Sequence, residues 1–161
     1  MKSLVLALSL VLACLVPAFA VDQAPDAFVK DLYTAHMPSA DGKGGGVLVD
    51  AKLRARFFAP DIAAAIKKDF DDSAKNDEVG AIDFDPVTDS QDPVVKDLKF
   101  DILASAGDKA QVKASFDRGE PKRAEIFYDL VKQSGQWHVA NISTKGAADE
   151  AWSLRELLQM K

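Results

Sequence analysis

Cysteine and histidine are scarce in this sequence, and their scarcity excludes several kinds of chemistry. Cys14 is the only cysteine, and His36 and His138 are the only histidines, among 161 residues. A chain with one cysteine forms no internal disulfide, so we expect a packed core to supply its stability. Two histidines far apart in the chain are also too few for a zinc site without carboxylate ligands. We therefore expect no metal and no other cofactor.

Long basic runs and the common catalytic motifs are also absent. No run of lysine and arginine is longer than the pair Lys67-Lys68, and the chain carries a formal net charge of −5. An acidic protein repels phosphate backbones and anionic headgroups, so the sequence predicts neither nucleic-acid binding nor contact with an anionic membrane surface. The patterns G-x-S-x-G, G-x-G-x-x-G, H-E-x-x-H and the P-loop do not occur, so no enzyme class follows from a motif.

An apolar leader at residues 1–20 is the most informative feature that is present. Lys2 gives it a positive start, residues 3–16 form an apolar run, and Ala18-Phe19-Ala20 is the pattern after which a signal peptidase cleaves. The run is shorter than the ~20 residues that span a membrane, and polar sequence follows it. We expect cleavage after Ala20 and export of residues 21–161, as a single domain, to the periplasm or the exterior.

A lipoprotein signal is the alternative interpretation of the leader. Val11-Leu12-Ala13-Cys14 loosely resembles the lipobox, in which the cysteine becomes acylated. Residues 15–21 stay apolar after this cysteine, whereas a lipid-anchored protein usually continues with a polar tether. We therefore favour a secreted product over lipid attachment through Cys14.

The first half of the exported chain shows helical periodicity. Pro25 suits the first turn of one helix, and the glycine-rich stretch 39–46 forms a loop after it. Asp50 is a candidate N-cap for a short helix, and Pro60 ends that helix and begins another. The apolar positions expected to be buried are Phe28, Leu32, Ala35, Leu53, Phe57, Ile62, Ile66 and Phe70. The charged run 71–77 is expected to end the last helix.

The second half alternates with a period of two, which is typical of strands with one exposed face. Apolar residues expected on the inner face are Leu98, Phe100, Ile102, Ala110, Val112, Ala114, Phe116, Ala124, Ile126, Tyr128 and Leu130, with a last strand around Trp137 and Val139. Strands joined by short turns predict an antiparallel meander of about four strands, and the whole pattern predicts an α+β fold with helices on one face of the sheet. A capping box from Ser153 to Glu156 predicts a short helix near the C-terminus.

Two apolar residues fall on the opposite, outer side of the third predicted strand. These are Phe127 and Val131. An apolar patch on an outer sheet face is typical of a covered surface. We take a second subunit as its cover, which predicts a homodimer through the outer sheet face.

The segment with the most chemical interest is G-A-I-D-F-D-P-V-T-D-S-Q-D-P, residues 80–93. Its polar residues include Asp83, Asp85, Asp89, Gln91 and Asp92. Crowded carboxylates repel one another, so they need cations, hydrogen-bond donors or full solvation. Three interpretations stay open. The segment binds calcium, although its spacing departs from the EF-hand loop; its aspartates make turns and caps; or it forms a polar binding site for a ligand or partner.

The same segment carries a family resemblance. I-D-F-D-P followed by Gln91-Asp92, a closing strand with Trp137-His138-Val139 and a terminal S-L-R-E-L-L together resemble the exported bacterial family called domain of unknown function 3828. The likeness extends from about Ala24 to Met160. It implies an NTF2-like, or cystatin-like, cone in which a curved antiparallel sheet wraps a helix. It implies no activity, because the family has no established one.

A cone of this kind often holds a pocket between helix and sheet, which adds residues to the candidates. Tyr33 and His36 lie about one turn apart on the first predicted helix and are candidates to face such a cavity with Trp137 or the Asp83 carboxylate. The candidate binding residues are Tyr33, Asp83, Asp85, Gln91, Asp92 and Trp137. For His36, a solvated position near the helix C-terminus is the simpler expectation.

Three functions are compatible with these observations. We favour a non-catalytic periplasmic binding or accessory protein that holds an envelope protein or a small ligand. The first alternative is a small pocket enzyme of isomerase, dehydratase or hydrolase type with an aspartate or histidine base. The second alternative is a structural component of the cell envelope.

Overall fold

The computed structural model describes residues 22–37, 46–146 and 151–160. The predicted leader with Cys14 lies outside the described residues, and so does the predicted glycine-rich loop except for Gly46. Within the part of the chain that is described, no helix is long and apolar enough to cross a membrane.

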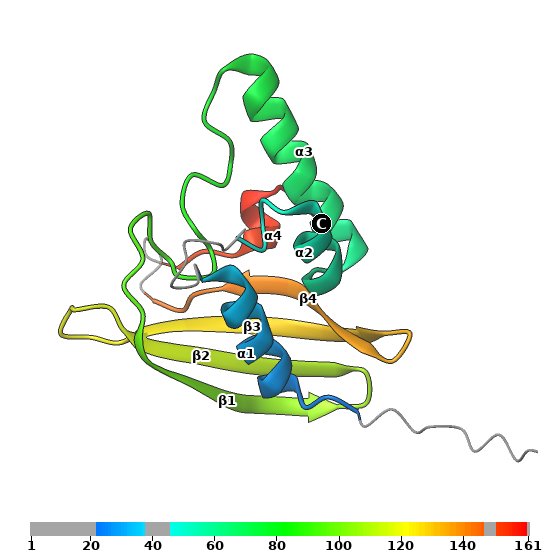
Figure 1. Ribbon diagram of the computed structural model, residues 1–161, viewed down its shortest axis with the longest axis vertical. Helices are drawn as coiled ribbons and strands as arrows, with labels where there is room; N and C mark the ends of the chain where they lie inside the picture. Colours follow the sequence, from blue (N-terminus) through cyan, green and yellow to red (C-terminus); the bar gives the residue numbers. More distant parts are fainter. Residues whose placement is uncertain (1–21, 38–45, 147–150, 161) are drawn as a thin grey trace, which may run out of the picture.

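The described residues form an α+β fold with one four-stranded antiparallel sheet (Figure 1). The strands are β1 (Lys96–Ala106), β2 (Lys109–Asp117), β3 (Ala124–Gln133) and β4 (Gln136–Ser143). The helices are α1 (Pro25–His36), α2 (Ala51–Phe57), α3 (Pro60–Asn76) and α4 (Leu154–Leu157). The sheet order is β1-β2-β3-β4, which confirms the predicted meander. Consecutive strands pair because each turn between them is short.

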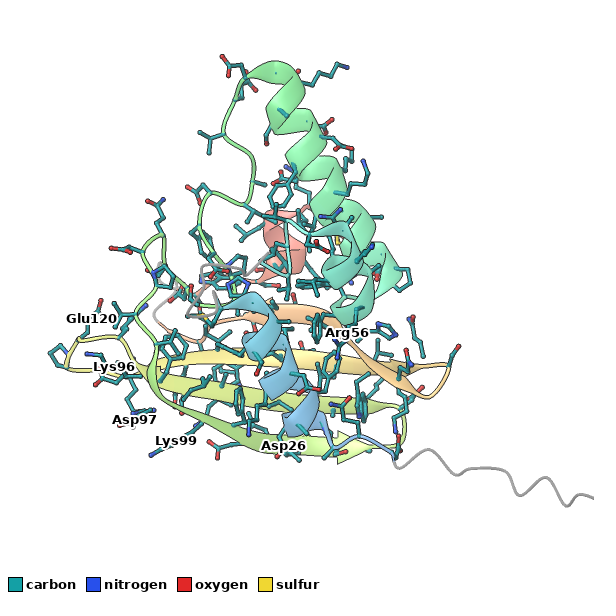
Figure 2. The ribbon with its side chains drawn as sticks, in the orientation of Figure 1. Asp26, Arg56, Lys96, Asp97, Lys99 and Glu120 are labelled. Atoms are coloured by element: carbon teal, nitrogen blue, oxygen red, sulfur yellow. The ribbon has the colours of Figure 1, made fainter. Side chains whose placement is uncertain are left out.

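Helix α1 lies across β1 and β2 on one face of the sheet, while α3 rises away from it (Figure 1). Fully buried large side chains come from α1, α2, α3 and the strands β2, β3 and β4; they include Leu32, Tyr33, Phe57, Ile62, Ile66, Phe116, Ile126, Tyr128 and Ile142. Every predicted inner-face position of β2 and β3 is buried, because alternate side chains of a strand point to the same face and here that face packs on the helices. Figure 2 shows the side chains on this scaffold.

The segment between α2 and α3 covers the outer edge of β4. Asp50 caps α2 as predicted, since its carboxylate accepts from the backbone N–H groups of Lys52 and Leu53. Beyond α2, Phe58 forms a parallel bridge with Val139, and the Ala59 N–H donates to the Val139 carbonyl at 2.9 Å. A second bridge joins Ser143 of β4 to Ser153. The sheet edge at β4 is therefore occupied by the chain itself.

The prediction that α3 ends at the charged run 71–77 was wrong. The helix continues to Asn76, and Asp77 ends it in a left-handed conformation with φ 55°. Ion pairs one turn apart, Lys67–Asp71 and Lys68–Asp72, support the exposed face of these last turns. Charged residues of opposite sign spaced four residues apart stabilise a helix. The run 71–77 had been interpreted only as polar residues that end the helix.

The prediction for β1 was correct only in part. Leu98 and Phe100 are partly buried against the core, but Ile102 is 46% exposed. The strand has register irregularities on both sides of its central residues, and among the described residues no strand lies beyond it. At the edge of a sheet and beside a bulge, a side chain on the inner face has few neighbours to cover it. The alternation of apolar and polar residues cannot predict this exposure.

The outer face of the sheet is covered at Phe127 by the chain itself. Phe127 is buried within the single chain, where the Lys145 ammonium lies 4.1 Å from its ring centroid, so its burial needs no second subunit. The homodimer through the outer face stays a prediction.

The predicted capping box at the start of α4 was wrong. The Ser153 hydroxyl donates to the Asn141 side-chain oxygen at 3.2 Å and makes no cap bond.

Gly80 begins the acidic segment and offers a test of how that segment is attached to α3. A Cβ at this position would lie 2.5 Å from the Ser73 hydroxyl and 2.6 Å from an Asp69 carboxylate oxygen. The same carboxylate accepts from the N–H groups of Ala81 (2.8 Å) and Ile82 (3.1 Å), so it is not free to retreat. We expect Gly80→Ala to lower the free energy of unfolding by about 1–3 kcal/mol in chemical denaturation.

The matched control for this substitution is the same change in an Asp69→Ala/Ser73→Ala background. There both obstructing side chains are gone, so Gly80→Ala should cost less than about 0.5 kcal/mol. Equal costs in the two backgrounds would show that the close approach to Asp69 and Ser73 has no energetic weight.

Candidate functional site

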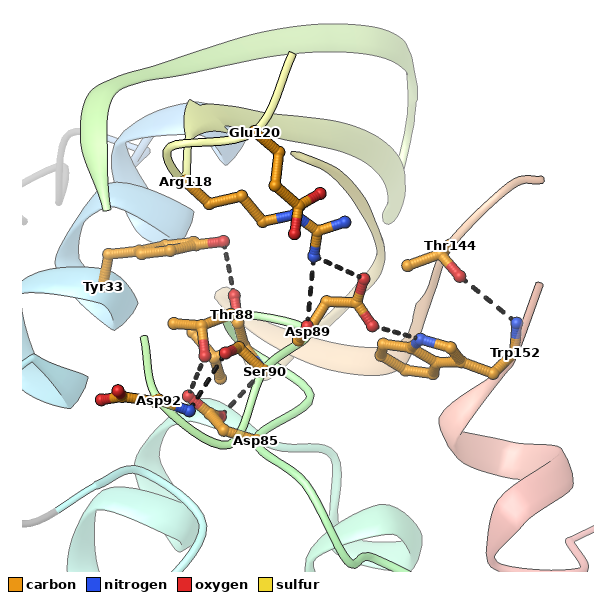
Figure 3. A network of polar contacts seen from close by, with 11 residues as sticks. Tyr33, Asp85, Thr88, Asp89, Ser90, Asp92, Arg118, Glu120, Thr144 and Trp152 are labelled. Atoms are coloured by element: carbon orange, nitrogen blue, oxygen red, sulfur yellow. Dashed lines mark hydrogen bonds and ion pairs between the residues drawn. The ribbon is translucent and has the colours of Figure 1, made fainter. Parts of the chain in front are cut away.

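The acidic segment is organised around the carboxylate of Asp85. One oxygen accepts from the Val87 N–H at 3.0 Å, and the other accepts from the Thr88 hydroxyl at 2.5 Å. The Asp85 N–H in turn donates to the Ser90 carbonyl at 3.0 Å, which closes the turn (Figure 3). A stable turn of this kind forms when an aspartate carboxylate accepts from a backbone N–H two residues ahead and from a side-chain hydroxyl three residues ahead.

His36 connects this turn to the end of α1. Its Nε2 lies 2.8 Å from the second Asp85 oxygen, and its Nδ1 accepts from the Val47 N–H at 3.3 Å. Because Nδ1 acts as an acceptor, we assign the proton of a neutral ring to Nε2, which then donates to Asp85. Both ring nitrogens are engaged, and the expectation that His36 is solvated was wrong, since its side chain is only 11% exposed.

Asp89 attaches the other side of the segment to the rest of the protein. One carboxylate oxygen accepts from the Trp152 indole N–H at 2.7 Å, and the other accepts from the Arg118 guanidinium at 3.3 Å (Figure 3). The Trp152 ring also packs edge-on against Phe84, with ring centroids 5.0 Å apart. Charge-assisted bonds of this kind hold the segment to the β2–β3 connection and to the residues before α4.

Two tyrosines lie beneath the segment in the core. The Tyr33 hydroxyl donates to the Val87 carbonyl at 2.7 Å, and the Tyr128 hydroxyl donates to Tyr33 at 3.2 Å. Burial raises the pKa of Tyr33 well above its ordinary value, and burial together with the neighbouring Tyr33 does the same to the pKa of Tyr128. Both phenols therefore stay protonated and serve as structural donors.

A cleft of about 370 Å³ opens beside the Asp85 turn. Its described lining residues are His36, Gly46, Leu48, Val49, Phe70, Ile82, Asp83, Phe84, Asp85, Pro86, Ser90 and Gln91. The lining is mainly apolar, and Val49 within it is 72% exposed. A concave apolar surface with a few polar groups is the usual form of a small-ligand site.

The structure brings together three of the six candidate residues named from the sequence. Asp83, Asp85 and Gln91 all line the cleft, and the Gln91 side-chain amide donates to the Asp83 carbonyl at 3.1 Å. Asp92 follows the turn, where its N–H donates to the Ser90 hydroxyl, and it does not line the cleft.

Tyr33 and Trp137 do not face the cleft. Tyr33 is 2% exposed and lies in the core, as described above. Trp137 is attached to the start of the chain: its indole N–H donates to the Gln23 carbonyl at 2.8 Å, and the Lys132 ammonium lies 4.5 Å from its ring centroid. The suggested cavity shared by Tyr33 and His36 with Trp137 or the Asp83 carboxylate was therefore wrong for Tyr33 and Trp137. His36 and Asp83 do line one cleft, together with Asp85.

Several lining residues were missed by sequence reasoning. Leu48 and Val49 follow a glycine-rich stretch, and Ile82 and Phe84 had been considered only as spacers between aspartates. The one usable signal is the strict alternation of apolar and acidic residues from Ile82 to Asp85, all four of which line the cleft. Nothing local predicts that Trp152 closes over Phe84.

The arrangement offers little to a metal ion. Among residues 22–37, 46–146 and 151–160, no three or more His, Cys, Asp or Glu side chains converge to hold one. The Asp85 and Asp89 carboxylates point instead to protein donors. The interpretation of the aspartates as turn-makers and caps accounts for both of them, and the calcium interpretation gains no support from their positions.

Comparison with known proteins adds no functional information. No protein-family model matches the chain, and no curated protein matches it. One solved structure, a protein of unknown function from Bacteroides thetaiotaomicron, is similar over 74% of this chain and 88% of its own, with 15% sequence identity and a TM-score of 0.44. That similarity is too weak to carry an argument about fold family, and the resemblance to domain of unknown function 3828 stays a prediction.

Proposed function

We propose that this protein is an exported, non-catalytic binding protein, and that the cleft beside Asp85 holds the apolar part of a small ligand or of a partner's segment. The observation that carries the proposal is the apolar lining of the cleft around exposed Val49. An isolated exposed valine needs no explanation. Val49, however, lines an apolar cleft with a volume of about 370 Å³, and water solvates such a cleft poorly.

The charge of the surroundings supports a neutral or cationic ligand over an anionic one. Asp83 and Asp85 line the cleft, and the Asp83 carboxylate makes no hydrogen bond or ion pair with any described residue. The described lining contains no lysine or arginine to compensate these carboxylates, so an anionic ligand would be repelled there.

The pocket-enzyme alternative has less support. His36 uses Nε2 on Asp85 and Nδ1 on the Val47 N–H, and Asp85 accepts from three donors in all. A general base needs an unengaged lone pair within reach of a substrate proton. His36 offers none, and three donors already occupy the Asp85 carboxylate. The Asp83 carboxylate is unengaged, but it is exposed and no described residue orients it, so we favour binding.

We also infer that the α+β fold is a member of the NTF2-like, or cystatin-like, group and that the chain acts in the periplasm or outside the cell. The NTF2-like assignment is supported by helix α1, which packs across a four-stranded meander, and by the position of the other helices towards β4. Action in the periplasm or outside the cell is supported by the leader sequence at residues 1–20.

A pair of exposed valines tests the binding site. Val49 lines the cleft, whereas Val79 is 81% exposed and does not line it. We expect the neutral dye Nile red to bind the protein with increased fluorescence. Val49→Asp should weaken this binding at least about tenfold, because a carboxylate would have to be desolvated on contact with the dye.

The control variant is Val79→Asp, which adds the same charge to an equally exposed position elsewhere. It should leave the dye affinity within about twofold of the unmodified protein, since a surface substitution away from the site changes little. If both variants lose binding equally, or neither does, the cleft is not the binding site.

A further inference from the structure

The two edges of the sheet are treated differently by the chain. The β4 edge is covered by the bridges from Phe58 and Ser153. On the β1 side, no strand or bridge of the described residues pairs with the edge (Figure 1). An unpaired edge presents backbone donors and acceptors to any other strand that fits it.

Exposed apolar side chains gather at this free edge. The large hydrophobic residues that are exposed in the described chain are Val49, Val79, Val94, Ile102 and Leu103. Ile102 and Leu103 are adjacent in β1, and Val94 lies two residues before the strand begins. Most of the exposed large apolar residues therefore lie on or beside a single strand.

The central residues of β1 have a self-complementary pattern. Leu98-Lys99-Phe100-Asp101-Ile102 is symmetric about Phe100 in its apolar positions and antisymmetric in its charges. Placed antiparallel to a second copy with Phe100 opposite Phe100, the strand sets Leu98 opposite Ile102 and Lys99 opposite Asp101. Every pair is then either apolar with apolar or positive with negative, and opposite charges across strands stabilise the pairing.

The two faces of the sheet agree with this pairing. Phe100 and Ile102 pair with Ala114 and Val112 of β2, which are buried on the face that carries α1, so the apolar pairs would extend the inner face. Lys99 and Asp101 point to the outer face and both are exposed. The Asp101 carboxylate lies 3.5 Å from the Lys113 ammonium of its own chain, yet 58% of its side chain stays exposed to a second copy.

We propose that two copies of this chain associate edge to edge through β1, antiparallel and centred on Phe100, to form a continuous eight-stranded sheet. The partner is a second copy because the charge pattern fits only a strand with the reverse order of charges, which this strand itself provides when it is turned around. The association is distinct from the ligand cleft and does not depend on the proposed function.

Charge exchange at the edge tests the proposal. Sedimentation velocity of the purified protein at about 100 µM should show a dimer that dissociates on dilution, as expected for a small interface. Lys99→Asp sets an aspartate opposite Asp101 twice in each dimer, and Asp101→Lys does the converse. Each single variant should weaken dimerisation about tenfold or more, and the double variant K99D/D101K should restore it to within about threefold.

Two controls make the result decisive. Lys75→Asp makes the same charge change on α3, which rises away from the sheet, and should leave the dimer intact. Circular dichroism should show that all variants keep the native fold. A monomer at about 100 µM, or a double variant that fails to recover, would overturn the proposal. So would a dimer that resists both single changes but is lost in Val131→Glu, because that result would place the contact on the outer sheet face instead.

Discussion

Raising the pH above about 10 should unfold this protein and ionise both of its tyrosines in one transition. The chain has only two tyrosines, and both Tyr33 and Tyr128 lie in the core. Burial raises the pKa of each above the ordinary value of 10.0, which the unfolded chain retains. Below that pH both states keep their phenolic protons and stability is unaffected. Above it only the unfolded state loses them, so stability falls by up to about 1.4 kcal/mol per pH unit for each tyrosine.

The measurement is a pair of titrations on one sample. Phenolate absorbance near 295 nm should rise with the same midpoint as the loss of far-ultraviolet circular dichroism. Tyr128→Phe is the control, since it should halve the absorbance change and leave the two midpoints coincident. A phenolate signal that appears while the circular dichroism is still native would show that one of the hydroxyls reaches solvent in the folded protein.

The second large effect is expected from two aspartates that are equivalent in local sequence. Asp85→Ala should lower the free energy of unfolding by about 3 kcal/mol, because it removes the acceptor of the Val87 N–H, the Thr88 hydroxyl and His36 together. Asp83→Ala, two residues earlier, removes an exposed carboxylate with no such bonds and should change stability by less than about 0.5 kcal/mol. Urea denaturation of both variants measures the difference.

A double-mutant cycle separates the His36 contact from the rest of the turn. If His36 stabilises the protein through Asp85, the cost of His36→Ala should shrink by about 1 kcal/mol or more when Asp85 is already alanine. Equal destabilisation by Asp83→Ala and Asp85→Ala would show that the segment responds to its total charge rather than to this turn. The dye-binding assay on Asp83→Ala then reports on the cleft, since that variant should fold normally.

Much of the fold could be predicted from the sequence because its signals are local. Pro25, Asp50 and Pro60 mark helix starts through fixed backbone geometry and a side-chain cap that needs no distant partner. The alternation in β2 and β3 predicted which side chains are buried, since these strands have neighbours on both sides. The same rule failed at Ile102, where a bulge and a free edge change the exposure of a correctly assigned strand residue.

The candidate site was located from the sequence only to within a segment. Crowded aspartates mark residues 80–93 as unusual, and Asp83, Asp85 and Gln91 do line the cleft. The apolar half of the cleft was missed, because Leu48 and Phe70 come from elements that meet the segment only after folding. Trp137 was placed with the site on the strength of its residue type, and the fold carries it to the N-terminal end of α1 instead.

By itself the sequence determined where helices and strands begin and which residues of the central strands face the core. The tertiary structure alone decided which aspartates hold the acidic segment to the rest of the protein. Asp85 makes a local turn with Val87 and Thr88, but His36, 49 residues away, joins that turn to α1, and Asp89 is an anchor because Trp152, 63 residues away, donates to it. Donors that come from distant parts of the chain cannot be recognised in the local sequence, so the sequence did not separate these carboxylates from that of Asp83, which is exposed at the cleft.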